Sequence, residues 1–168
     1  RNVTGVQTCA LPILGDGWGH IIYCHKNNYE QIKSICDSIS PEIEIRLVDK
    51  DLDRNDYNNL LLDINFWNEI DCEKVLIYQT DTFILNDFDD SFLEYDYLGA
   101  NWGPGSHFDF LKKTIYIDTE VWNGNGGLSL RTVENMKLAL QDESFKQLYL
   151  FADIDNNLDK IPEDLYFS

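Results

Sequence analysis

Positive charge is scarce in this chain of 168 residues: 13 Lys and Arg stand against 30 Asp and Glu, giving a net charge of −17 at pH 7. Nucleic acids and anionic membrane surfaces are bound through an excess of Lys and Arg that displaces counterions. Long apolar runs are also missing, since no stretch approaches the roughly 20 residues that cross a bilayer. We therefore expect no nucleic-acid partner, and no membrane span within this sequence.

Several sequence motifs are absent as well. The four cysteines show no CxxC spacing, so we expect neither a disulfide framework nor a zinc knuckle. We expect a reducing, soluble compartment, with the cytoplasm favoured. The Gly-Lys-Ser/Thr of a P-loop and the GxSxG of many hydrolases do not occur. Because no nucleophile motif accompanies them, the histidines should have structural roles; they are His20, His25 and His107.

What the chain does have is material for a core. Hydrophobic residues make up 43% and aromatic residues 13%, far above a disordered composition. Val3 to Ile13 (VTGVQTCALPI) resembles the translation of a sequencing adapter fused to reading frames in metagenomic assemblies. We therefore treat residues 1–13 as an artefactual segment and 14–168 as the domain, with a genuine mobile N-terminus as the alternative. Three cysteines then remain, an odd number that argues further against disulfides.

Short apolar runs alternate with helical patterns from residue 20 onward. This order favours a parallel α/β sheet with right-handed crossovers. Lys74 to Tyr78 (KVLIY) is almost continuously apolar, which is typical of a strand buried on both faces, and we expect it at the centre of the sheet. The first predicted elements are strands at 20–24, 43–48 and 74–78 and helices at 29–39 and 57–70.

The remainder of the chain is less regular. We find no internal repeats and no long linker, so we expect one domain, incomplete at both ends. The later elements are strands at 97–100 and 114–117, a Gly/Pro loop at 103–105, a helix at 132–140 and a helix beginning near Pro162.

Three clusters of residues are candidates for chemistry. Gln79, Thr80 and Asp81 follow the KVLIY strand, and ligands of open α/β sheets bind outside the carboxyl ends of the strands. A carboxylate there can hold a hard divalent cation, which would neutralise a diphosphate leaving group. The ordinary structural explanation is that Asp81 caps the turn after the strand.

The second and third clusters are a glycine segment and an acidic pair. The segment NGNGG (123–127), which we expect to be a loop before a strand, allows close approach of a ligand to the backbone. It lacks the dinucleotide fingerprint, because Ser129 stands where the third glycine is needed. Glu163 and Asp164 follow Pro162 and resemble either the first turn of a helix or the location of a general base.

Five ordered segments of this chain resemble an uncharacterised family of glycosyltransferase-like domains. The resemblance implies a GT-A fold, the Rossmann-like α/β fold of nucleotide-diphospho-sugar transferases, in which helices flank a mixed sheet. It extends from about residue 17 to the end. The segments are DYNNLLLDINFW (56–67), EKVLIYQTDTFIL (73–85), YDYLGANW (95–102), WNGNGGLSLR (122–131) and PEDLYF (162–167).

The resemblance implies transfer of a sugar from a nucleotide-diphosphate donor to a hydroxyl of a glycan, lipid or protein. GT-A enzymes usually carry Asp-x-Asp at the strand end, and the last acid binds Mn²⁺ or Mg²⁺ on the diphosphate. Asp81 takes that metal role here, whereas Gln79 replaces the first acid with a neutral amide, and Thr80 lies between them. Either Glu163 or Asp164 would supply the catalytic base, and the stereochemistry stays open.

Further roles follow from the same resemblance. Arg131 would bind an acid or the diphosphate, with a surface salt bridge as the alternative. Trp102 and Trp122 would stack on sugar rings, with a place in the core as the alternative. The floor of the donor and acceptor site would be lined by Asn125, Gly126, Gly127, Leu128 and Ser129.

The adapter-like segment stands where GT-A domains have the strand and loop that hold the nucleotide base. We therefore expect this fragment to be inactive or barely active. A non-catalytic carbohydrate- or sugar-nucleotide-binding domain is the alternative, because of Gln79 and that replaced unit. A calcium-binding loop is disfavoured, since Arg54 and Leu158 stand where EF-hand loops need glycine.

Overall fold

The computed structural model describes residues 18–79, 82, 84–86, 88–101, 123–143 and 167. The chain divides into two compact units: the first unit takes residues up to 54 and 79–90, and the second unit takes residues 55–78 and 91 onward. The segment 3–13, the loop at 103–105, the strand at 114–117 and the helix near Pro162 all lie outside the described residues.

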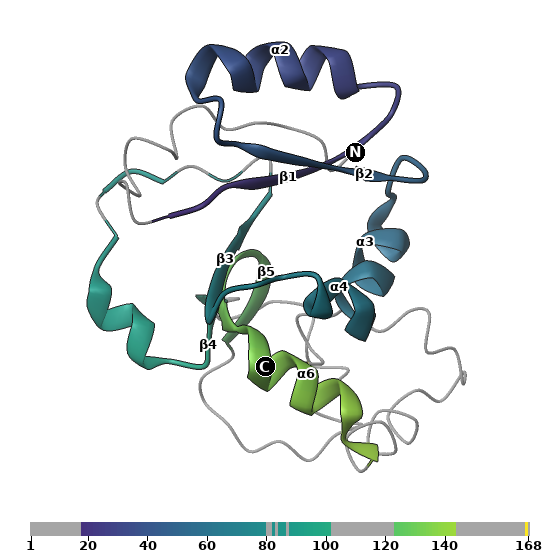
Figure 1. The fold of residues 1–168 in the computed structure, drawn as a ribbon. Coiled ribbons are helices and arrows are strands. Elements are labelled where there is room, and N and C mark those ends of the chain that lie inside the picture. Colours follow the sequence, from purple (N-terminus) through teal and green to yellow (C-terminus); the bar gives the residue numbers. More distant parts are fainter. Residues whose placement is uncertain are drawn as a thin grey trace. The chain divides into compact units, whose positions relative to one another are not determined.

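The first unit is a strand, a helix and a second strand, as the sequence predicts. Strand β1 (Ile21–His25), helix α2 (Tyr29–Ile39) and strand β2 (Glu44–Val48) follow one another, and β1 and β2 are parallel. Figure 1 shows α2 covering one face of the strand pair. A later segment of the chain, around Phe88, also belongs to this unit. The rings of Trp18 and Phe88 meet edge to face, with their centroids 5.2 Å apart.

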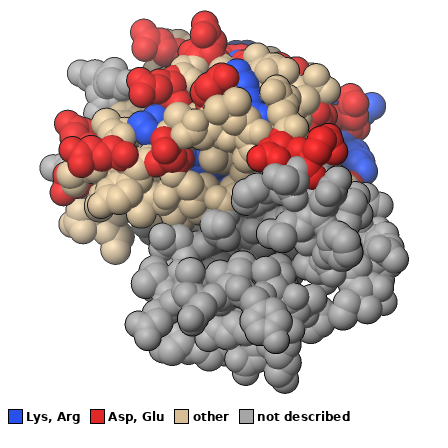
Figure 2. Space-filling model, turned by 90° about the horizontal axis from the view of Figure 1, so that it is seen from below, with Lys and Arg blue, Asp and Glu red and all other residues tan. Residues whose placement is uncertain are grey.

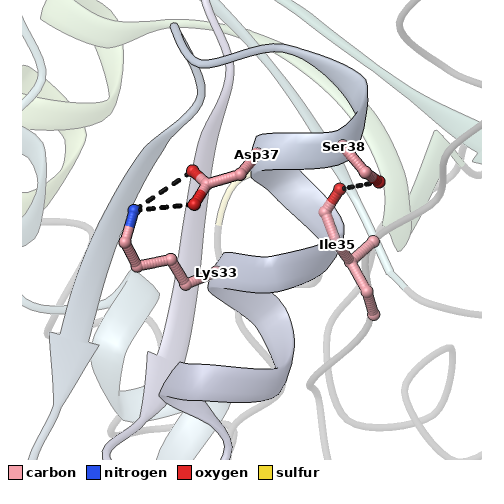
Figure 3. A network of polar contacts seen from close by, with 4 residues as sticks. All are labelled: Lys33, Ile35, Asp37 and Ser38. Carbon is pink, nitrogen blue, oxygen red and sulfur yellow. Dashed lines mark hydrogen bonds and ion pairs between the residues drawn. The ribbon is translucent and has the colours of Figure 1, made fainter.

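The core of the first unit lies between α2 and the strands. Periodicity predicts that Ile32 and Cys36 share the inner face of the helix, and both are buried there with Cys24 and Ile43. On exposed α2 positions the Lys33 ammonium donates to both carboxylate oxygens of Asp37, at 3.1 and 3.0 Å (Figure 3). The helix therefore separates an apolar from a charged face, as an amphipathic helix must.

The predicted helix at 57–70 is wrong in one respect, because the structure has two helices there. Helix α3 (Arg54–Leu61) ends before Asp63, and helix α4 (Ile64–Asn68) begins after it. Asp63 has extended backbone and its carboxylate accepts the Asn65 N–H at 2.9 Å, so it acts as an N-cap. The fully buried Trp67 links the two helices, because its indole N–H donates to the Leu61 carbonyl at 2.8 Å.

The second unit contains a sheet of three described strands. They are β3 (Lys74–Tyr78), β4 (Tyr97–Asn101) and β5 (Asn123–Thr132), in the order β3-β5-β4, and both pairs are antiparallel. Within this sheet β5, not β3, is therefore central, which corrects the expectation for KVLIY and for a wholly parallel sheet. The expectation that this strand is buried on both faces is also wrong, because all five residues of β3 are only half-buried. An apolar run does not specify the hydrogen-bonded neighbours of a strand.

Helix α6 (Val133–Gln141) completes the second unit, and its position confirms the predicted helix at 132–140. It packs against α4 and β5 and buries Val133, Met136 and Leu140. A short 3₁₀ helix, η1 (Asp90–Glu94), precedes β4.

Among the described residues, no helix has the length and apolarity that a membrane crossing requires. Figure 2 shows how often Asp and Glu occur on the described surface.

Candidate functional site

The carboxyl end of β3 is the first candidate location. The strand ends at Tyr78 and is followed directly by the half-buried Gln79, whose carbonyl accepts the Thr82 N–H at 3.0 Å. A hydrogen bond between residues three apart is that of a β-turn, so the chain turns immediately after the strand. Thr80 and Asp81 lie outside the described residues, and their roles stay predictions.

The glycine segment is strand, not the loop that the sequence analysis expects. Ser129 pairs with Gly99 and Asn125 pairs with Ala100, so the pairing with β4 steps over residues 126–128. Such a bulge bends the strand locally, and glycine tolerates the required backbone geometry. The glycines that suggested a loop therefore mark an irregularity within a strand.

The strand end and the glycine segment meet in the register of the sheet. Tyr78, the last residue of β3, pairs with Leu128, which follows Gly127 directly. The chain thus leaves β3 next to the bulged part of β5. This adjacency within the second unit is what the structure shows of the predicted donor site.

Ser129 and Arg131 lie inside the second unit. Their exposed fractions are 1% and 0%, and the Arg131 Nε donates to the Ser129 hydroxyl at 2.9 Å. The surface salt bridge considered for Arg131 is therefore wrong, because such a pair needs an exposed side chain. The other interpretations, an acid partner or the diphosphate, stay predictions.

Aromatic rings surround the Arg131 guanidinium. Its central carbon lies 5.2 Å from the ring centroid of Tyr97, 5.5 Å from that of Phe167 and 5.9 Å from that of Trp67. We call Trp67, Tyr97, Ser129, Arg131 and Phe167 the Arg131 cluster. Its members come from four of the five segments that carry the family resemblance. In the sequence, the signal that could have pointed to this cluster is Arg131, a charged residue that directly follows the apolar LSL run.

Of the C-terminal motif, the structure describes Phe167 alone. Its side chain is 9% exposed, and its ring meets that of Trp67 edge to face at 6.0 Å. Glu163 and Asp164 lie outside the described residues, as does Trp102 at the other end of β4. For Asn125 and Gly126 only the backbone is described. The structure thus locates one residue of the motif, Phe167, and the roles of Glu163 and Asp164 stay predictions.

A second polar location, in the first unit, was missed by the sequence analysis. His25 ends β1 and Asp51 follows β2, and their Nδ1 and Oδ1 atoms are 3.7 Å apart. The Asn27 N–H also points to His25 Nδ1, at 3.4 Å. Both residues stand at carboxyl ends of parallel strands, and this strand-end placement is the signal that could have found them. Neither one carries a motif of its own.

Burial and ion pairing shift several pKa values in the first unit. Burial lowers the pKa of His20, and burial together with the Cys36 charge raises the pKa of Cys24. The hydrogen bond from Arg46 lowers the pKa of Glu44, and the Arg46 Nε lies 2.6 Å from the Glu44 Oε1.

Among the residues that the structure describes, no three His, Cys, Asp or Glu are grouped to hold a metal ion.

Small sheets and the helices packed on them define a mixed α/β protein. The chain belongs to the family described as "Protein of unknown function (DUF5672)", whose profile matches residues 42–168. That range contains all five resembling segments, so membership in an uncharacterised family is confirmed. No curated protein and no solved structure matches the chain.

Proposed function

We propose that the chain is a glycosyltransferase of GT-A fold that moves a sugar from a nucleotide-diphosphate donor to a hydroxyl acceptor. The observation that supports this most is the pairing of Tyr78, the last residue of β3, with Leu128, which directly follows the glycine segment in β5. A sugar diphosphate needs both features, a carboxylate for its cation and a backbone that small residues leave open.

Asp81, with Gln79, is the proposed holder of Mn²⁺ or Mg²⁺. Carboxylate and amide oxygens are the ligand type of hard cations, and Mg²⁺ sites commonly use one or two protein carboxylates plus substrate phosphates. The donor chemistry of Gln79 and Asp81 fits such an ion. When bound, the ion would neutralise charge on the departing diphosphate.

The proposed reaction is a direct displacement. Glu163 or Asp164 takes the proton from the acceptor hydroxyl, whose oxygen then forms the new bond to the anomeric carbon as the bond to the diphosphate breaks. Alignment of donor and acceptor by Asn125, Gly126, Gly127 and Ser129 would supply much of the rate. Trp102 would stack on a sugar ring.

One observation favours a second candidate, a non-catalytic domain that binds a sugar nucleotide or carbohydrate. Gln79, which directly follows β3, has a neutral amide where GT-A enzymes usually have an acid. One carboxylate fewer weakens the hold on a cation, and catalysis depends on that cation more than simple binding does.

The test incubates the full-length protein with a panel of sugar nucleotides and either Mn²⁺ or Mg²⁺. We expect release of nucleoside diphosphate, by transfer or slow hydrolysis, that falls roughly 100-fold or more in Asp81→Asn because the charge that holds the cation is lost. Asp71→Asn removes an exposed carboxylate before β3 and should leave the rate unchanged.

The two candidates give different results in this assay. Tight donor binding without any product favours the binding domain. Equal rates for wild type and Asp81→Asn would overturn the assigned metal role, and absence of both binding and turnover would overturn the proposed function.

A further inference from the structure

The Arg131 cluster joins four segments that are distant in the sequence. Trp67 comes from α4, Tyr97 from β4, Ser129 and Arg131 from β5, and Phe167 from the C-terminal motif. Arg131 is in contact with all the others: its Nε donates to Ser129, and its guanidinium lies 5.2 to 5.9 Å from the three ring centroids. The arginine is therefore the common contact of the cluster.

A buried guanidinium needs favourable partners on every side, because removing its charge from water is costly. A flat, delocalised cation stacks well on aromatic faces, and such a cation–π contact is stronger where water is excluded. Phe167 supplies one of three such faces and is itself 9% exposed. Arg131 and Phe167 therefore stabilise each other's burial.

We propose that Arg131 is a positioning residue, which holds Phe167, the last residue of the C-terminal PEDLYF motif, against α4 and the central strand. For its catalytic meaning this inference rests on the proposed function, which takes the base from that motif. In the sequence Asp164 precedes Phe167 by three residues. Since one residue spans at most about 3.6 Å, fixing residue 167 restricts residue 164 to roughly 11 Å around it.

The first test measures hydrogen exchange of the backbone amides at 163–168 and needs no activity. The variants are Arg131→Lys, which keeps the charge without the planar face, and Phe167→Leu, which keeps apolar bulk without the ring. We expect exchange to rise about tenfold in both, because the segment opens locally more often. Phe92→Leu makes the same change at a partly exposed ring on η1 and should leave exchange at 163–168 unchanged.

The second test measures transfer by the same variants. A misplaced base slows the chemical step, so we expect kcat to fall roughly 10- to 100-fold in Phe167→Leu while KM for the donor stays constant. Phe167→Tyr keeps the ring and should restore both the low exchange and kcat.

The outcomes separate the two proposals. If hydrogen exchange rises in the variants but the wild-type protein shows no transfer, the docking role of Arg131 is retained and the proposed function is rejected. Unchanged exchange in both folded variants overturns the inference, whatever the activity. A rise in KM with constant kcat overturns the role in positioning the base.

Discussion

Cys24 and Cys36 show how a single residue's chemistry follows from its place. Both thiols belong to the core between α2 and the strands, with exposed fractions of 0% and 2%. Burial raises the pKa of each because a thiolate is poorly solvated there. Cys72 lies on an exposed turn before β3 and donates to the Lys74 carbonyl at 3.2 Å. The described cysteines are free thiols, in agreement with the expectation of no disulfide framework.

We predict that iodoacetamide at about pH 8 modifies Cys72 first and leaves Cys24 and Cys36 intact in the folded protein. The pKa is raised in all three thiols, so the difference in rate comes from burial, which keeps the reagent away from Cys24 and Cys36 but not from Cys72. Peptide mass spectrometry locates the label, and labelling in denaturant, where all three should react equally, is the control. Native-state labelling of Cys24 as fast as Cys72 would contradict the assigned core.

The break between α3 and α4 is the clearest lesson at the element scale. Hydrophobic spacing from Tyr57 to Ile70 predicts one continuous helix with Leu60, Ile64 and Trp67 on its inner face. Trp67 is buried, but Leu60 and Ile64 are only half-buried, and Tyr57 and Leu61 are buried instead. The spacing does not predict that Asp63 caps a second helix, because the cap depends on one side chain that accepts a hydrogen bond from a nearby backbone N–H. By contrast, the sequence predicts α2 with the observed bounds.

Asp63→Ala should destabilise the protein by about 1 kcal/mol, because the Asn65 N–H loses its acceptor and the start of α4 loses a favourable charge. Chemical denaturation measures this as a lower midpoint with an unchanged m-value. Asp71→Ala, which removes an exposed acid without a capping bond, is the matched control and should change stability little. Equal midpoints for both variants would show that the cap contributes nothing.

The glycine segment illustrates a different limit of sequence reasoning. NGNGG has the composition of a loop, but β4 pairs with it at Asn123 and Asn125, and the strand continues into residues 128–132, which pair with β3. Those partners are distant in the sequence, so no local signal reveals them. The same holds for the Arg131 cluster, whose residues were recognised as separate motifs but not as neighbours.

At the scale of the whole molecule, the dominant property is the net charge of −17. Figure 2 shows Asp and Glu at several places on the described surface, with fewer Lys and Arg between them. Like charges at this density repel one another and disfavour the compact state. The ion pair between Lys33 and Asp37 is exposed and offsets little of this repulsion.

We predict that raising NaCl from about 20 to about 200 mM increases Tm by about 2–4 °C, with little further gain, because screening shortens the range of the repulsion. Thermal unfolding followed by circular dichroism checks this, and KCl should act equally. A constant or falling Tm over that range would show that repulsion between the acidic groups is unimportant for stability.

The first unit is assembled from two separate stretches of chain, since residues 79–90 return to it after 55–78 have joined the second. Trp18 consequently meets Phe88, which lies 70 positions further along the sequence. During translation, then, the nascent polypeptide cannot finish this unit until about residue 90 has left the ribosome. Residues 55–78 of the second unit are therefore made before the first unit can be finished, and residues 1–54 have to wait for 79–90.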